Sequence, residues 1–231
     1  NYQAEETIDT GNSIVMPGLI NTHTHAAMAY FRGLADDLPL NIWLTKHIFP
    51  AEAKYINEEF IRKSGELSCL EMIKSGATCF NDMYFFGQEF LAEIVEKAGI
   101  RALLGLDLKT PGYSIEQALE LASKYEGHDL IKITLAPHSV YVCAREILEK
   151  VKFAAEANNL RIHIHVSETK KEVEDCKNVR GKSPVEYLDE LGLLTEKLTA
   201  AHSVWLSETD LQIYKNRGVK VAHCPISNMK L

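Results

Sequence analysis

The stretch Pro17-Gly-Leu-Ile-Asn-Thr-His-Thr-His25 indicates how this chain folds, because a short apolar run ends there in two histidines. Side chains alternate between the two faces of a strand, so His23 and His25 point the same way and can grip one ion. His165 and His202 end two later strand-like runs. Parallel strands wrapped into a barrel bring such residues together at its carboxyl-end mouth, where barrel enzymes carry their active sites. The pattern predicts a metal-dependent hydrolase.

Short strand-like runs alternate with longer amphipathic segments that have helical spacing, which is typical of an α/β protein with a parallel sheet. Repetition of this unit predicts a (β/α)8 TIM-type barrel. A complete barrel typically needs about 250 residues, whereas this chain has 231. We therefore expect only about seven βα units, with strand eight missing. The predicted strands are 18–24, 77–83, 101–108, 131–137, 160–166, 198–203 and 219–224.

The first residues do not follow the barrel pattern. Residues 5–13 read as a strand-turn fragment, so we expect 1–14 to be the remnant of a small flanking β-sandwich and 15–231 to be the incomplete barrel. The connection from Ala26 to about Gly76 is much the longest. A long loop at the mouth of a barrel predicts a substrate lid or pocket wall.

Composition narrows the class of protein. A net charge of −7 argues against binding to nucleic acid or to an anionic membrane surface. No stretch is long and apolar enough to span a bilayer. The five cysteines are odd in number and never occur as Cys-x-x-Cys, which favours free thiols in a reducing compartment and hence the cytoplasm. A homo-oligomer is left open.

A single His-x-His pair is a weak signal, because two half-exposed polar residues at a strand end would look the same. The addition of His165 and His202 at other strand ends favours metal binding. A histidine cluster without cysteine suits zinc, and iron is an alternative. His163 shares the face of His165 but lies two residues deeper, so we expect it to be a hydrogen-bonded core histidine.

Glu168 follows His165 by three residues. A carboxylate at this place can act as a general acid or base beside an activated water. The alternative is a solvated loop acid that heads the charged run Lys170-Lys-Glu172. Spacing alone leaves both interpretations open.

Further motifs extend over essentially the whole chain. Besides residues 16–25 they are Arg32-Gly-Leu-Ala-Asp-Asp-Leu-Pro-Leu40, Trp43, Phe49-Pro-Ala-Glu52, Asn81-Asp-Met-Tyr84, Ala136-Pro-His-Ser139, His163-Ile-His-Val-Ser-Glu-Thr169, Ala200-Ala-His202 and His223-Cys-Pro-Ile-Ser-Asn-Met-Lys-Leu231. In this order they resemble the amidohydrolase superfamily. More narrowly, the chain is similar to the 5-methylthioadenosine/S-adenosylhomocysteine deaminases and their relatives, including the triazine hydrolases.

The resemblance implies roles for individual residues around one divalent ion, zinc or iron. His23, His25 and His165 would be metal ligands. His202 would hydrogen-bond the attacking water or the substrate, and Glu168 would bind the substrate and pass a proton to the ring nitrogen next to the reacting carbon.

The resemblance also implies a substrate-binding set. Trp43, Glu52 and His138 match family positions that touch the nucleoside, with Glu52 on the ribose hydroxyls. Trp43 could instead be a buried lid anchor, and His138 a capped strand-end residue. Two features depart from the family: the final aspartate ligand of strand eight lies outside this sequence, and arginines after strand three are replaced by Lys109-Thr-Pro-Gly-Tyr-Ser114.

The activity implied is metal-dependent hydrolytic deamination of an adenine nucleoside derivative, with release of ammonia. Candidate substrates are 5'-methylthioadenosine, S-adenosylhomocysteine and adenosine. We expect activity to require the missing C-terminal part. The alternatives are the same type of reaction on a triazine or guanine-like ring, and an inactive metal-binding fragment.

Overall fold

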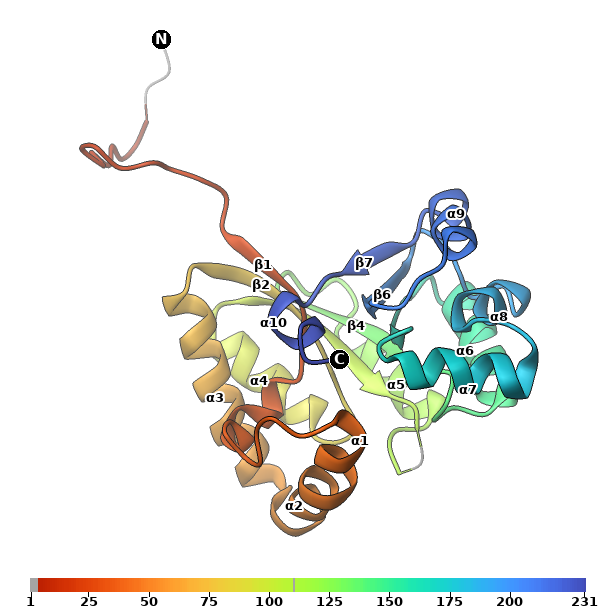
Figure 1. Ribbon diagram of the computed structural model, residues 1–231. Coiled ribbons are helices and arrows are strands. Elements are labelled where there is room, and N and C mark those ends of the chain that lie inside the picture. The colour runs from red at the N-terminus through yellow and green to blue at the C-terminus, as the bar shows by residue number, and fades with distance from the viewer. Residues whose placement is uncertain (1–3, 110) are drawn as a thin grey trace.

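The computed structural model describes residues 4–109 and 111–231. Seven parallel strands follow one another around a nearly closed barrel, each hydrogen-bonded to the next in chain order (Figure 1). Helices connect them on the outside. The strands are β1 Leu19–Thr24, β2 Ala77–Tyr84, β3 Arg101–Asp107, β4 Ile131–Ala136, β5 Arg161–Val166, β6 Leu198–His202 and β7 Lys220–Ala222.

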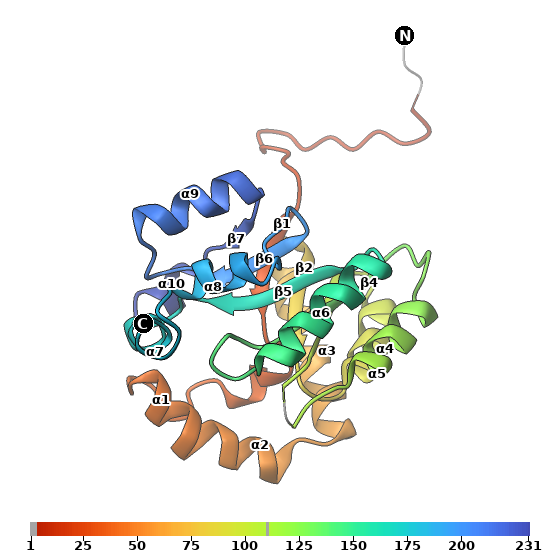
Figure 2. The same ribbon diagram turned by 90° about the vertical axis from the view of Figure 1, so that its right-hand side faces the viewer.

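The helices fall into two groups. A chain of short turns runs over the mouth between β1 and the first long helix, and longer helices then cover the outside of the strands (Figure 2). The first group is η1 Ala26–Phe31, α1 Leu40–Ile42, η2 Trp43–Ile48 and α2 Phe49–Tyr55. The second is α3 Glu58–Lys74, α4 Gln88–Ala98, α5 Ile115–Lys124, α6 Arg145–Ala157, α7 Lys170–Arg180, α8 Pro184–Glu190 and α9 Glu208–Arg217. A single short turn, α10 Pro225–Asn228, follows β7 and belongs to neither group.

The predicted strands and the partial TIM-type barrel are confirmed. Most strand ends agree to within one residue, and β7 is the exception because it stops at Ala222 rather than at residue 224. There the chain turns into α10, whose first residue is Pro225. The hydrogen-bonded pairing of β7 with β6 ends at Ala201 and Ala222, so residues 223 and 224 lead into the helix instead of extending the strand.

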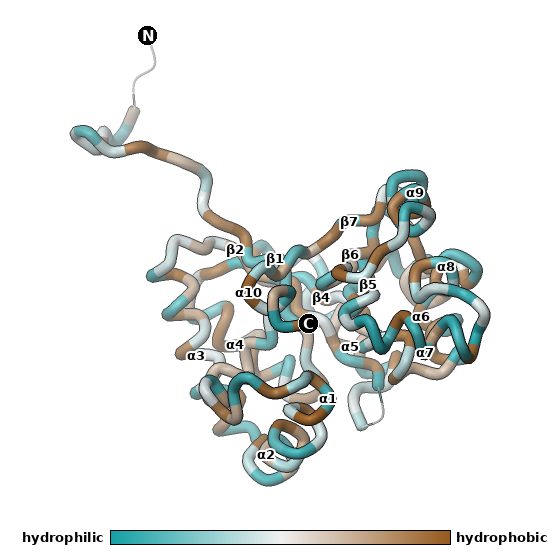
Figure 3. Tube along the Cα trace, viewed as in Figure 1, coloured by the Kyte–Doolittle hydropathy of each residue, from teal (hydrophilic) through white to brown (hydrophobic). Residues whose placement is uncertain are grey.

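The core forms because paired strands such as β3 and β4 carry apolar side chains on a shared face, where alternate residues come together. Leu104 and Leu106 on β3 and Leu135 on β4 are completely buried. Along the outer helices hydrophobic and hydrophilic segments alternate, so each helix can turn an apolar stripe toward the sheet (Figure 3). This packing holds the carboxyl ends of the strands in fixed positions.

The expected β-sandwich remnant is not confirmed. Residues 4–18 contain a turn at Gly11 but no strand, and they run away from the barrel (Figure 1). In this segment Ile14 and Val15 are exposed, so they find no strand partner among the described residues. The division at residue 15 stays a prediction.

Within the described residues, β1 and β7 form the two edges of the sheet. Ile20 on β1 and Val221 on β7 are accordingly exposed. All five cysteines are free thiols, as predicted. Over the part of the chain that the structure describes, no helix combines the length and the apolar character needed to cross a membrane.

Candidate functional site

The histidines predicted from the strand ends do converge. His23 lies near the end of β1 and His25 just beyond it. His165 is the next-to-last residue of β5, and His202 ends β6. One ring nitrogen from each of His23, His25 and His165 lies within 4.8 Å of the other two. The register places Val166 of β5 beside His202 of β6, so neighbouring strands end at the same level.

Two of these rings are oriented by backbone carbonyls. Nδ1 of His25 lies 2.7 Å from the carbonyl oxygen of Met83, and Nδ1 of His165 lies 2.8 Å from that of His138. A carbonyl only accepts, so each Nδ1 carries the proton and each Nε2 keeps its lone pair. The two Nε2 atoms face one another at 3.3 Å. Such outer contacts fix the tautomer of metal-binding histidines, and these residues therefore fit a metal ion.

The third ring is held by another histidine. Nδ1 of His23 lies 3.0 Å from Nε2 of His163, which is buried deeper on β5. The prediction of a hydrogen-bonded core histidine at His163 is confirmed. Burial lowers the pKa of His163 to about 3 and that of His25 to about 4. Burial also lowers the pKa of His23 and His165. Neutral imidazoles are the form that binds metal.

His202 sits where the backbone is strained. Its φ of 68° is in the left-handed region, which costs a non-glycine residue about 1–3 kcal/mol and is concentrated at functional sites. Asn228 of α10 holds the ring from behind, with Oδ1 3.0 Å from His202 Nδ1 and Nδ2 donating to the His202 carbonyl at 3.1 Å. Nε2 of His202 is left facing Oε1 of Glu168 at 3.5 Å.

The interpretation of Glu168 as a solvated loop acid is wrong. Its side chain is buried, with the residue only 7% exposed, and it lines the cavity beside the histidines. Burial, together with the nearby charge of Glu172, raises the pKa of Glu168 to about 8. At neutral pH the carboxyl group therefore keeps its proton and can act as an acid.

Glu172, the last residue of the charged run in that alternative interpretation, is not solvated either. The residue is 5% exposed, and its two carboxylate oxygens accept hydrogen bonds from the backbone N–H groups of Ser167 and Glu168, at 3.1 and 2.7 Å. Burial raises the pKa of Glu172 to about 7. Glu172 thus holds the turn that carries Glu168. Only its spacing of four residues from Glu168 on the sequence could have suggested this contact.

The predicted site residues line one cavity of about 300 Å³. Its wall contains the three predicted metal ligands His23, His25 and His165, which we call the histidine triad. It also contains His202, Glu168 and the predicted substrate set of Trp43, Glu52 and His138. The long first connection contributes Trp43 and Glu52, so it forms a pocket wall.

Local contacts hold the substrate set in place. The indole N–H of Trp43 donates to the carbonyl of Leu34 at 2.9 Å, which anchors the loop before α1. Oε1 of Glu52 accepts from the hydroxyl of Tyr84 at 2.6 Å, and burial raises the pKa of Glu52. Since Trp43 also lines the cavity, it is both a loop anchor and a part of the wall.

Lys109, the positively charged residue that follows β3, makes its contacts within the protein. Nζ of Lys109 lies 3.4 Å from Asp107 Oδ2 and packs over the rings of Phe49 and Phe85. Burial raises the pKa of Asp107 to about 6, against the opposing effect of Lys109. Lys109 also lies on the cavity wall.

The predicted set of three histidines contains no cysteine, but a cysteine lies beside it. Cys224 lines the same cavity, and its sulfur and one ring nitrogen each of His23 and His202 lie within 4.8 Å of one another. The predicted strand 219–224 contained Cys224, but nothing in the spacing of Cys224 from the histidines indicated its approach to His23 and His202.

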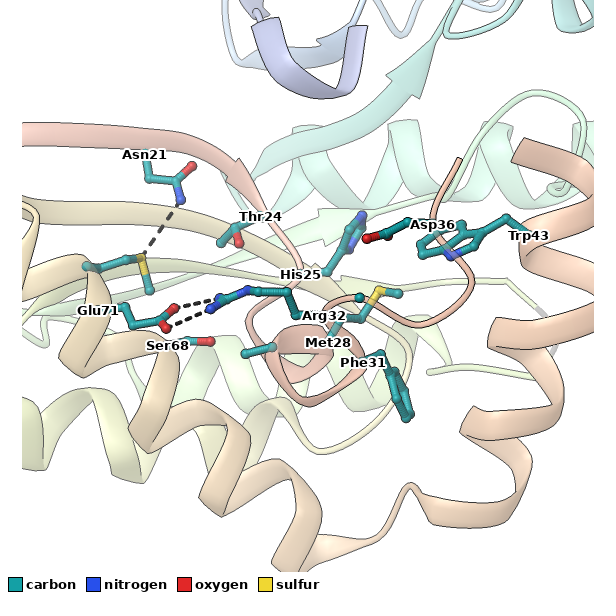
Figure 4. A pocket seen from close by; sticks show the side chains of 13 residues that line it. Asn21, Thr24, His25, Met28, Phe31, Arg32, Asp36, Trp43, Ser68 and Glu71 are labelled. Atoms are coloured by element: carbon teal, nitrogen blue, oxygen red, sulfur yellow. Dashed lines mark hydrogen bonds and ion pairs between the residues drawn. The ribbon is translucent and has the colours of Figure 1, made fainter. Parts of the chain in front are cut away.

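A second, more open cavity of about 510 Å³ adjoins the first. The two share His25, Met28 and Trp43. Figure 4 shows one side of it closed by Arg32, whose guanidinium makes two hydrogen bonds to Glu71 of α3, at 2.8 and 2.6 Å. A bidentate pair of this kind ties η1 to α3.

Comparison with known proteins agrees with this geometry. The chain is 50% identical over 227 residues to a 5-methylthioadenosine/S-adenosylhomocysteine deaminase of Thermodesulfovibrio yellowstonii. The aligned region covers 95% of this chain and 52% of the relative. It is 44% identical to a 5'-deoxyadenosine deaminase of Methanothermobacter thermautotrophicus, over 99% of this chain and 55% of the relative. The chain thus spans about half the length of these curated relatives.

Among solved structures, an adenosine deaminase from Xanthomonas campestris with bound zinc is similar, with a TM-score of 0.90 and 38% identity over 94% of this chain and 51% of that one. An atrazine chlorohydrolase from Arthrobacter aurescens, at 20% identity and a TM-score of 0.84, shares the fold over 93% of this chain and 54% of its own. The model of the amidohydrolase family matches residues 14–231. This chain therefore belongs to the amidohydrolase family.

Proposed function

We propose that the protein is a metal-dependent deaminase of adenine nucleoside derivatives. In this reaction water adds to the purine carbon that bears the amino group, the carbon–nitrogen bond breaks, and ammonia leaves. The names of the relatives, 5-methylthioadenosine/S-adenosylhomocysteine deaminase and 5'-deoxyadenosine deaminase, support this substrate class.

One observation carries the proposal. A protonated acid and a set of neutral imidazoles line the same cavity, with Glu168 Oε1 3.5 Å from His202 Nε2 and the triad of His23, His25 and His165 on the same wall. Such an arrangement can protonate a ring nitrogen on one side while a nucleophile is held on the other.

The metal ion fits the triad because the lone pairs of its imidazoles face one another. When bound there, a divalent ion such as zinc would supply an activated water at neutral pH. Zinc is favoured over iron by the zinc bound in the similar Xanthomonas campestris structure.

The protein's own groups have separate tasks. Glu168 holds a proton that it can give to the ring nitrogen beside the reacting carbon, because its pKa is raised to about 8. His202 is kept neutral by burial, and its Nε2 can accept a hydrogen bond from the attacking water. Asn228 fixes the tautomer that leaves this nitrogen free.

The other end of the cavity suits a sugar. Glu52 uses Oε1 for the Tyr84 hydroxyl, so Oε2 is available to accept from ribose hydroxyls. Trp43 and His138 provide ring surfaces along the same wall. A base and its ribose would then lie between the acid at Glu168 and the carboxylate at Glu52.

The test uses the protein together with the C-terminal part that activity is expected to require. It measures ammonia released from 5'-methylthioadenosine, 5'-deoxyadenosine and adenosine, and compares it with release from guanine and from an amino-substituted triazine. We expect turnover of the adenine nucleosides. The variant Glu168→Gln should keep its metal content while kcat falls by a factor on the order of 10²–10⁴. The control is Glu174→Gln, a change at an exposed residue of α7. Deamination of guanine alone, or full activity of Glu168→Gln, would contradict the proposal.

We further propose a cytoplasmic location, supported by the five free cysteines. The net charge of −7 supports a protein that does not bind nucleic acid. Whether copies of the protein associate stays open to measurement by light scattering.

A further inference from the structure

Cys224 gives the histidine cluster a second way to hold a metal ion. Two groups of metal-binding side chains occur among the described residues: His23 with His25 and His165, and His23 with His202 and Cys224. We propose that the second group is an alternative binding site for thiophilic ions such as Cd²⁺ or excess Zn²⁺, and that an ion bound there inhibits the protein.

The geometry of His202 suits a ligand. The amide of Asn228 donates from Nδ2 to the His202 carbonyl and to Nδ1 of His223, at 3.1 and 3.0 Å, so its Oδ1 must be the atom that meets His202 Nδ1. The Nδ1 of His202 therefore carries a proton, and its Nε2 keeps a lone pair. That nitrogen is free to bind an ion.

The sulfur of Cys224 is positioned and accessible. Cys224 precedes α10, and its carbonyl accepts from the N–H of Asn228 at 2.7 Å, which fixes its backbone. The side chain is half-buried and lines the cavity of about 300 Å³, so an ion that enters the cavity can reach it. Its contact with the Ala222 carbonyl, at 3.4 Å, is a weak thiol hydrogen bond that is lost when the proton leaves.

The spacing of the three donor atoms is close to that of a metal site. Bonds of about 2.0–2.3 Å to nitrogen and sulfur place the ligand atoms of a tetrahedral zinc site about 3.3–3.8 Å apart. The three atoms here lie within 4.8 Å of one another, so shifts of about an ångström bring them into range. A thiolate selects soft ions, unlike the all-imidazole triad.

The two metal-binding sites cannot be occupied at the same time because they share His23. Its Nδ1 is engaged with His163 at 3.0 Å, which leaves only Nε2 for an ion. An ion bound to Cys224 therefore draws His23 away from His25 and His165. It also occupies His202, whose Nε2 faces Glu168. Both effects disable the arrangement described above.

The experiment titrates the purified protein with Cd²⁺ and follows the ultraviolet charge-transfer absorption of a cadmium–thiolate bond. We expect this band in the wild-type protein and its loss in Cys224→Ser and Cys224→Ala. The control is Cys79→Ser, because Cys79 is half-buried on β2 and belongs to neither metal group. This variant should keep the band.

Activity gives the second measurement. In Cys224→Ser the concentration of Cd²⁺ for half-inhibition should rise at least about tenfold, the scale of a lost metal-site partner. A band that persists in both Cys224 variants, no band in any protein, or unchanged inhibition would overturn the proposal. Because the absorption does not depend on any substrate, it separates this inference from a failure of the proposed deamination.

Discussion

Replacement of Glu172 by Gln tests how the acid at Glu168 is held. The two carboxylate oxygens of Glu172 accept from the backbone N–H groups of Ser167 and Glu168, at 3.1 and 2.7 Å, and both groups are buried. Glutamine has nearly the same shape but offers one acceptor oxygen, and its amide presents N–H groups to the other donor. One buried backbone N–H is therefore left without a partner.

The size of the effect follows from that count. An unsatisfied buried donor costs about 1–3 kcal/mol. If this cost falls on the turn that carries Glu168, kcat drops by roughly ten- to a hundredfold. The substitution also removes a negative charge that helps to raise the pKa of Glu168. The fraction of Glu168 that holds its proton then decreases, and the basic limb of the pH–rate profile moves to lower pH.

The assay compares ammonia release and thermal unfolding for Glu172→Gln and Glu174→Gln. Glu174 lies on the same helix but is exposed and pairs with Lys170, so its loss should change neither quantity by more than a few tenths of a kcal/mol. Metal content serves as the check that the triad is intact. If Glu172→Gln matches Glu174→Gln in kcat and in the position of its basic limb, the reasoning about Glu168 is refuted.

Three further outcomes are expected. In chelator-treated protein, Glu168→Gln should unfold at the same temperature as wild type near pH 4.5, and at a higher temperature than wild type above pH 8. The reason is that the pKa of Glu168 in the folded protein, about 8, lies above its ordinary value of 4.5. The wild-type protein therefore loses stability as the pH rises through this window. An equal difference at both pH values would contradict the burial argument. Gly105→Ala should destabilise the fold by about 1–3 kcal/mol in urea unfolding, because its Cβ would lie 2.7 Å from the Asp82 carbonyl oxygen on β2; an unchanged midpoint would show that the strands can separate there. Tyr84→Phe should raise KM for adenosine more than it lowers kcat, since it frees Glu52 from its hydrogen bond, and a fall in kcat alone would contradict a role of Glu52 in sugar binding.

Strand ends and the convergence of the histidines were predictable because both follow from periodicity. The alternation in residues 161–165 requires His163 and His165 to share a face, and the parallel order then brings strand ends to one mouth. The lengths of the strands were predictable for the same reason. Only β7 was too long in the prediction, because its pairing with β6 ends at Ala222, and periodicity along the chain does not show where a partner strand ends.

Contacts that depend on turns could not be read from the chain. Glu172 lies in a run that looks solvated, yet the turn at Ser167, with φ of 51°, folds it back onto the backbone of the preceding residues. Cys224 approaches His23 through the break between β7 and α10. No periodic pattern encodes such a break, so the extra ligand and the buried carboxylate appear only in three dimensions.

The central claim is that His23, His25 and His165 together bind one metal ion. Anomalous X-ray diffraction at the zinc absorption edge, on crystals of the protein grown with one equivalent of zinc, tests this most directly. We expect a single strong peak with ring nitrogens of all three residues at about 2.0–2.1 Å, and no such peak in His165→Ala. Anomalous peaks at surface side chains only would contradict the account. So would a structure in which the rings of His23, His25 and His165 form hydrogen bonds to other protein groups and bind no metal ion.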